Sequence, residues 1–407
     1  MKIISSILLV LFFFTLAISS SFSQPARDIS QANNKFAFDL YSRFNVQQGN
    51  IFFSPYSLSS ALTMTYEGAR HETANEMREV LYLPSDEVDW RVDVSSFIQS
   101  INKPHKAYEL SLANTLWAQK SYLFKEEYLN LVKNTYFAQA RNLDFAADPD
   151  GSRITINKWV SDNTKDHIND LLPVRSITKD TRLVLTNAVY FKEKWSIPFD
   201  KGMTKQDVFW ISSGAVQIAM MGLIGKSFNY IENDQAQVLE LPYRGEKLSM
   251  LIILPRSKEI QGLEKSLTLD IFNQWQRGMT LQGVNFFLPK FKFDWQMEMS
   301  NILSGMGMKL AFDENNADFS GMADKKLGEN LYIGAVFHRA WIETNEEGTE
   351  AAAATSVVGM RPTFVRILPE PKIFRADHPF IFVIRDNKTG HILFMGRVSD
   401  PRENEKY

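Results

Sequence analysis

The segment NIFFSPYSLSSALTM occupies residues 50–64. Its apolar residues 51–53 predict a short strand, and Ser54 followed by Pro55 is typical of a helix start, because serine caps the first turn and proline fits its first position. The helix is expected to continue through residues 64–67 and to end at Gly68. The segment therefore predicts a strand that leads directly into a helix.

The rest of the chain divides into a helical first part and a second part that is rich in predicted strands. Residues 29–44 and 73–81 have apolar residues at helical spacing, and helical patterns continue to about residue 172. From Leu183 onward the candidates are strands, at 184–191, 238–241, 248–254, 284–288, 335–343, 380–385 and 392–398. This segregation predicts an α+β fold, and the absence of a Gly/Ser-rich or Pro-rich linker predicts one domain over residues 24–407.

Composition excludes several classes of function. The chain has 407 residues, 44% of them hydrophobic, with a net charge of −2. Such a charge gives no electrostatic reason to expect nucleic acid or an anionic membrane as a partner. Because there are no cysteines, disulfides, thiolate zinc sites and cysteine nucleophiles are excluded.

The N-terminus predicts export. Lys2 precedes an apolar stretch at 7–18, and Ser21-Phe22-Ser23 has the small-x-small pattern of a cleavage site, so residues 1–23 are interpreted as a signal peptide. An uncleaved anchor is the alternative, but a spanning helix needs about 20 apolar residues. We expect a secreted protein, extracellular or, in a Gram-negative bacterium, periplasmic, with no membrane association after cleavage.

No pattern predicts an enzyme, a metal site or a cofactor. There is no Gly-x-Ser-x-Gly motif, His71-Glu72 lacks a second histidine at metalloprotease spacing, and the six histidines are scattered. The run at 222–227 is similar to a phosphate-binding loop, but Met220 replaces its first glycine. We therefore assign no catalytic residue.

One segment between two predicted strands stands apart. Residues 348–375 contain Gly359, Pro362, Pro369 and Pro371, and residues 349–356 are almost all small. Connections of this length without regular structure are usually functional or disordered.

Six blocks in the right order, between residues 33 and 401, resemble the serpins. Besides 50–64, they are INKWV at 156–160, LTNAVYFK at 185–192, LSGMGM at 303–308 with ADFSGM at 317–322, DHPFIF at 377–382 and LFMGRV at 393–398. The uninterrupted layout without cysteine looks more like bacterial than vertebrate members.

The resemblance implies three β-sheets, about nine helices and an exposed reactive loop at about 346–375. In that family a target protease cuts the loop, which then inserts as a strand into the largest sheet and traps the covalently attached protease. The implied partner is a serine protease, or alternatively a cysteine protease. The implied working state is a monomer that is prone to loop–sheet polymers.

The start of the loop resembles the hinge of inhibitory serpins. Side chains alternate in a strand, so if Thr349 faces the core on insertion, Ala351, Ala353, Thr355 and Val357 do too, whereas Glu350 faces solvent. The alternative interpretation is a helical alanine run in a non-inhibitory carrier or chaperone. The full hinge is Glu346, Glu347, Gly348, Thr349, Glu350, Ala351, Ala352, Ala353, Ala354 and Thr355.

The position of the bond that the protease would cut has several alternatives. In typical members it follows the fourteenth residue after the hinge glycine, which gives Pro362–Thr363, and Arg361–Pro362, Phe364–Val365 and Arg366–Ile367 are alternatives. We expect the bond in the region of Met360, Arg361, Pro362, Thr363 and Phe364, with a chymotrypsin-, elastase- or subtilisin-like target.

Other positions carry over from the matched blocks. Ser54, Ser57, Asn187 and His338 resemble the family's shutter, where hydrogen bonds hold the two central strands together. Trp195 resembles the aromatic at the end of the sheet where insertion begins, called the breach. Ordinary core packing is the alternative for each. Glycosylation of Asn387, in the sequon Asn387-Lys388-Thr389, stays open because it depends on the source.

Overall fold

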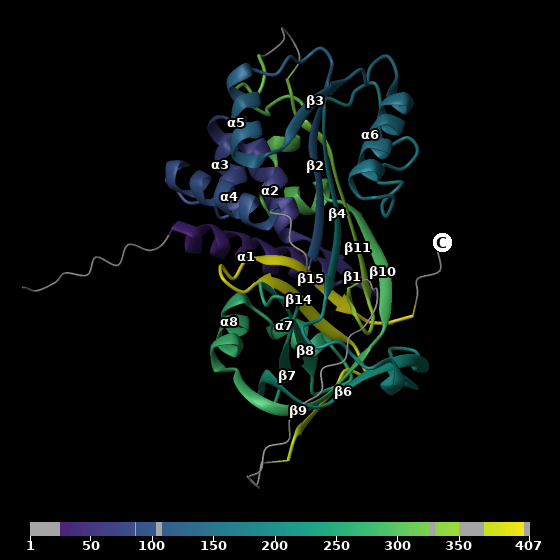
Figure 1. Ribbon diagram of the computed structural model, residues 1–407. Helices are drawn as coiled ribbons and strands as arrows, with labels where there is room; N and C mark the ends of the chain where they lie inside the picture. The colour runs from purple at the N-terminus through teal and green to yellow at the C-terminus, as the bar shows by residue number, and fades with distance from the viewer. Residues whose placement is uncertain (1–24, 86, 103–107, 325–329, 350–369, 403–407) are drawn as a thin grey trace, which may run out of the picture.

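The computed structural model describes residues 25–85, 87–102, 108–324, 330–349 and 370–402 (Figure 1). The predicted signal peptide lies outside these residues. None of the helices in the described part of the chain is long and apolar enough to span a membrane. Nine α-helices occur there: α1 (Pro25–Phe44), α2 (Pro55–Tyr66), α3 (His71–Val80), α4 (Glu87–Asn102), α5 (Glu126–Tyr136), α6 (Pro149–Asn163), α7 (Gln261–Ser266), α8 (Leu269–Gly278) and α9 (Ser300–Met306).

The smaller sheet positions the candidate site. Its strand order is β10 (Phe291–Glu298), β11 (Ile333–Thr344), β4 (Leu183–Lys194), β2 (Tyr108–Gln119) and β3 (Gln139–Leu143), and the short β12 (Gly348–Thr349) also pairs with β4. β11 and β4 run parallel, whereas β10–β11 and β2–β4 are antiparallel. In Figure 1, α6 lies on one side of these strands and α2 to α5 lie on the other.

The larger sheet has nine strands. Along it lie β1 (Ile51–Phe53), β15 (Ile392–Val398), β14 (Phe380–Asp386), β8 (Leu248–Pro255), β7 (Ala236–Pro242), β6 (Gly214–Glu232), β9 (Thr280–Pro289) and β13 (Lys372–Arg375), with β5 (Lys205–Ile211) paired to β6. Three sheets were expected, and the described residues form two hydrogen-bonded sheets because β6 and β9 are continuous. A register shift between Leu223 and Lys226 separates the part of β6 that pairs with β5 from the part that pairs with β7.

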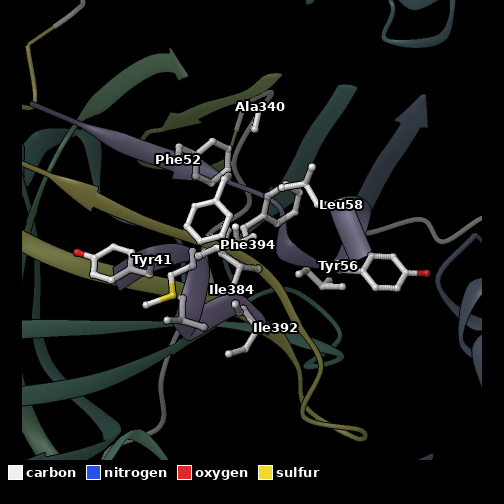
Figure 2. Close-up of a cluster of buried hydrophobic side chains, with 14 of the residues drawn as sticks. Tyr41, Phe52, Tyr56, Leu58, Ala340, Ile384, Ile392 and Phe394 are labelled. Carbon is white, nitrogen blue, oxygen red and sulfur yellow. The ribbon is translucent and has the colours of Figure 1, made fainter. Parts of the chain in front are cut away.

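The segment at 50–64 forms the predicted strand and helix. The Ser54 hydroxyl accepts a hydrogen bond from the Ser57 amide and caps α2, and Pro55 is its first residue. Phe52 of β1 is fully buried and stacks on Phe394 of β15, with ring centroids 5.2 Å apart. Figure 2 shows these rings at the centre of the main core, with the hydroxyls of Tyr41 and Tyr56 directed outward at opposite ends.

The two faces of β4 pack against different layers. Odd-numbered residues such as Leu185, Val189 and Phe191 belong to the main core, whereas Val184 and Ala188 belong to a smaller cluster that includes residues of α6. This alternation is the ordinary period of a strand that is covered on both sides.

The α+β class and the predicted strands from residue 183 onward are confirmed, but the first half was predicted as too helical. Residues 108–119 and 139–143 are the strands β2 and β3. β2 pairs with β4, which is remote in sequence, so tertiary context decides its conformation. The run at 222–227 lies within strand β6 and is followed by more strand, so the helix that a phosphate-binding loop requires is not there.

Candidate functional site

A row of polar side chains crosses three adjacent strands of the smaller sheet. His338 of β11 lies opposite Asn187 of β4, and Asn187 lies opposite Asn114 of β2. The His338 ring hydrogen-bonds through Nδ1 to Asn187 Oδ1. Asn187 Nδ2 donates to Asn114 Oδ1 over 2.7 Å. The row therefore links β11, β4 and β2 through side chains as well as through their backbones.

The hydrogen bonds of His338 determine its tautomer. The Ser54 amide donates to His338 Nε2 over 3.2 Å, so Nε2 must be an acceptor and Nδ1 must carry the hydrogen. His338 is fully buried, and this burial lowers its pKa to about 3, although the hydrogen bond with Asn187 opposes the shift. The ring is therefore neutral near pH 7.

Helix α2 supports the row from beneath. The Ser54 hydroxyl donates to the Leu393 carbonyl of β15 over 2.7 Å, which links the two sheets. The Ser57 hydroxyl donates to Asn114 Oδ1 over 2.9 Å and accepts from Asn187 Nδ2 over 2.6 Å. We call Ser54, Ser57, Asn114, Asn187 and His338 the shutter network.

The structure thus brings together all four predicted shutter residues. Asn114 is the member that sequence reasoning missed. Its signal was weak because the surrounding residues were interpreted as helical, and only the pairing of β2 with β4 shows that Asn114 stands beside Asn187.

Trp195 lies at the end of β4 and contacts the chain that leaves β11. Its indole nitrogen donates to the Asn345 carbonyl and its amide donates to the Glu347 carbonyl, each over 2.9 Å. The ring is buried and stacks on Tyr243 at 4.6 Å. The predicted breach residue therefore holds Glu347 of the predicted hinge, and Asn345 just before the hinge, by one hydrogen bond each.

The hinge begins with a tight turn, residues 345–348. The Asn345 amide donates to the Gly348 carbonyl over 2.9 Å, and the Gly348 amide donates back over 3.3 Å. Beyond the turn, β12 pairs antiparallel with β4, with Gly348 opposite Lys194 and Thr349 opposite Glu193. A Cβ atom on Gly348 would lie 2.0 Å from the Glu193 carbonyl oxygen, and φ there is +153°, so the position requires glycine.

Two ion pairs flank the hinge turn. Glu346 pairs with Lys290 over 3.0 Å and accepts from the Thr204 hydroxyl over 2.9 Å, whereas Glu347 pairs with Lys201 over 2.8 Å. Burial raises the pKa of Glu346, but hydrogen bonds from Lys290, from its own amide and from Thr204 outweigh burial and lower it. The acidic half of the predicted hinge is thereby anchored to residues outside the smaller sheet.

The predicted reactive loop is described only at its two ends. Glu350, the four alanines 351–354, Thr355 and the predicted reactive bond at 360–364 lie outside the described residues. Both ends of the segment 348–375 form strands, β12 and β13, instead of being irregular throughout. β13 pairs with β9, so the two ends of the loop are attached to different sheets. Within the described ranges, no three His, Asp or Glu side chains gather as a metal site would require.

Comparisons with known proteins agree with this arrangement. The family model for serpins, described as serine protease inhibitors, matches residues 31–401. A serpin-like protein of Methanosarcina acetivorans is 42% identical over 93% of this chain and 89% of its own length. The leukocyte elastase inhibitor of Equus caballus is 38% identical over 92% of this chain and 99% of its own. The structure of human thyroxine-binding globulin in complex with thyroxine matches over 93% of this chain and 100% of its own, with a TM-score of 0.83 and 29% identity.

Proposed function

Because this chain belongs to the serpin family, we propose that it is a secreted suicide inhibitor of serine endopeptidases, which it traps by inserting its cleaved reactive loop between β11 and β4. The observation that carries the proposal is the pairing of Gly348 and Thr349 with β4. The chain that leaves β11 already enters the seam that the rest of the loop would fill.

The strand directions favour insertion. β11 and β4 are parallel neighbours, and parallel pairing is slightly less stable per residue than antiparallel pairing. A strand that follows the hinge turn would run antiparallel to both. Insertion would therefore replace one parallel ladder with two antiparallel ones and gain backbone hydrogen bonds for the loop.

The register of the inserted strand follows from two independent pairings. Continuing the β12–β4 pairing places Thr355 opposite Asn187, and continuing the Asn345–Gly348 turn places Thr355 opposite His338. These agree with the observed pairing of His338 with Asn187. Insertion would thus separate His338 from Asn187, and a threonine hydroxyl, which donates and accepts, would reach both.

The same register explains why the hinge needs small residues. Ala351 would lie opposite Phe191, and Ala353 opposite Val189, on the face of β4 that packs in the main core. Glu350 would lie opposite Lys192, on the other face. A strand that must enter a packed sheet needs small side chains on its core face and can carry a charge on its other face.

The test is to mix the mature chain, residues 24–407, with elastase, chymotrypsin, subtilisin, trypsin and a papain-like enzyme. A complex that survives denaturation would establish suicide inhibition, and the mass of the released C-terminal peptide would identify the bond. The control is the same protease with its nucleophile inactivated, which should form no such complex. If every protease cuts the loop without being trapped, the alternative of a non-inhibitory ligand carrier or chaperone replaces this proposal.

Export is tested separately from inhibition. We expect the protein recovered outside the cytoplasm of its source cell to begin at Gln24. A protein that retains residues 1–23 would contradict the predicted cleavage.

A further inference from the structure

Glu193 is a buried acid at the point where the hinge meets β4. It is 1% exposed and lies directly opposite Thr349 in the β12–β4 pairing. In the alternation of β4 it follows Val189 and Phe191, so it lies on the face that packs in the main core. A carboxyl group there is removed from water next to the first residues that insert.

The oxygens of Glu193 lack ordinary partners. Neither makes a hydrogen bond of normal geometry with any described residue. Nine buried side-chain atoms in the described part of the chain share this condition, and four of them belong to Glu193, Thr344 and Glu347, at the same end of the sheet. Unsatisfied buried polar groups are rare in native proteins and are a reservoir of strain.

We propose that Glu193 is a proton-dependent positioning residue for the hinge: as a neutral acid it lets the end of β4 stay packed beneath Gly348 and Thr349, and as a carboxylate it releases them. Its consequence for inhibition rests on the proposed function, whereas the pairing of the hinge does not.

Electrostatics supports the neutral state. Burial raises the pKa of Glu193 to about 9, and the Lys194 amide and Arg244 oppose this only in part. In the backbone register, β2 places Tyr108 opposite Glu193 and Glu109 opposite Lys192, and the nearby cations are Lys192 and Lys194 of β4 and Arg244 of the β7–β8 turn. The carboxylates of the hinge turn, Glu346 and Glu347, face Lys290 and Lys201 instead. A charge on Glu193 would therefore have one facing cation and no hydrogen-bonding partner of normal geometry among the described residues.

The first experiment measures hydrogen exchange in the intact protein between pH 6 and pH 10, corrected for the intrinsic pH dependence of amide exchange. We expect the amides of Trp195, Phe199, Asn345 and Gly348, which close the hinge, to lose protection with a midpoint near pH 9. In Glu193→Gln this loss should vanish, while peptides from β14 remain equally protected in both proteins. Loss of protection with the same midpoint in Glu193→Gln, or no loss in the wild type, would overturn the proposal.

A second measurement covers the case in which Glu193→Gln packs poorly. The unfolded carboxyl ionises near pH 4.5, whereas the native one keeps its proton to about pH 9, so the wild-type unfolding constant should rise relative to Glu193→Gln and Glu193→Met by up to about tenfold per pH unit between these values. If the ratio of the wild-type unfolding constant to that of each variant does not change with pH, Glu193 is not a buried neutral acid. Neither measurement uses a protease, so failure to trap proteases would leave this result intact.

Discussion

His338 and Asn187 face each other across two parallel strands, and each nitrogen of the histidine ring is engaged: Nδ1 with the Asn187 carbonyl oxygen and Nε2 with the Ser54 amide. A second proton on the ring would replace the acceptor at Nε2 with a donor that points at another donor. The seam that the proposed insertion would open is therefore closed by a bond that depends on a neutral histidine.

Acid should weaken the native state through this histidine. Burial lowers the pKa of both His338 and His391 to about 3. As the pH falls, these two histidines are therefore protonated in the unfolded chain before they are protonated in the native one. The stability that each neutral histidine contributes is complete above about pH 6.5 and is lost as the pH falls toward 3, by about 1.4 kcal/mol per pH unit. Urea unfolding at pH 7 and pH 5 measures this.

The matched variants for that experiment are His338→Gln and His71→Gln. The first should remove the His338 share of the pH dependence, about 1.4 kcal/mol per pH unit below pH 6.5, whereas the second should leave it unchanged because the His71 side chain is 85% exposed. If the free energy of unfolding has the same pH dependence in all three proteins, protonation of the buried His338 ring does not affect stability.

A charge at a hinge position that would face the core after insertion should abolish inhibition. Thr349→Arg places a cation opposite the buried Glu193 on the core phase, where a large charged side chain must leave water and enter a packed sheet. We expect stoichiometry to rise from near one to several inhibitor molecules per protease, because cleavage outpaces insertion. Glu350→Arg, on the other phase, is the control and should retain most of the inhibition. Trapping by Thr349→Arg at unchanged stoichiometry would contradict the register.

Gly348→Ala should detach β12 from β4 without adding charge. The new methyl group would overlap the Glu193 carbonyl, and alanine does not adopt the required φ at low cost. We expect faster hydrogen exchange at Trp195 and a higher stoichiometry of inhibition. The same substitution at Gly49, which has positive φ but open space around it, controls for the cost of placing alanine at positive φ.

The ion pair between Glu346 and Lys290 should stabilise the closed sheet. Their side chains are 8% and 40% exposed, so we expect Glu346→Lys to cost about 1–2 kcal/mol, with faster polymerisation on heating. Lys290→Glu in the same chain restores opposite charges and should recover most of the loss. Failure of the double variant to improve on Glu346→Lys would show that the carboxylate acts through Thr204 instead.

Local chemistry explains which features could be predicted. The cap at Ser54, the proline after it and the β-branched and aromatic run from Val184 to Phe191 are readable because short-range effects favour the observed conformation. The grouping of Ser54, Ser57, Asn187 and His338 came from resemblance to a family, since no spacing in the sequence implies that they meet.

Features that depend on distant partners escaped prediction. Asn114 belongs to a strand whose conformation depends on β4, and the joining of two expected sheets depends on how far β6 and β9 extend. Glu193 follows the predicted strand 184–191, and no local pattern in the sequence marks it as buried. Its burial follows from the hinge turn and the β7–β8 turn that pack against it, and both lie far along the chain.

The position of β14 has a consequence for biosynthesis. This strand lies between β8 and β15 within the nine-stranded sheet, and both it and β15 are made after all the other strands of that sheet. Until they leave the ribosome, β8 has an open edge and Phe52 lacks its stacking partner Phe394. The larger sheet can therefore be completed only after residue 398 has left the ribosome, and a nascent chain that stalls before residue 380 presents an unpaired edge to chaperones and to other copies of itself.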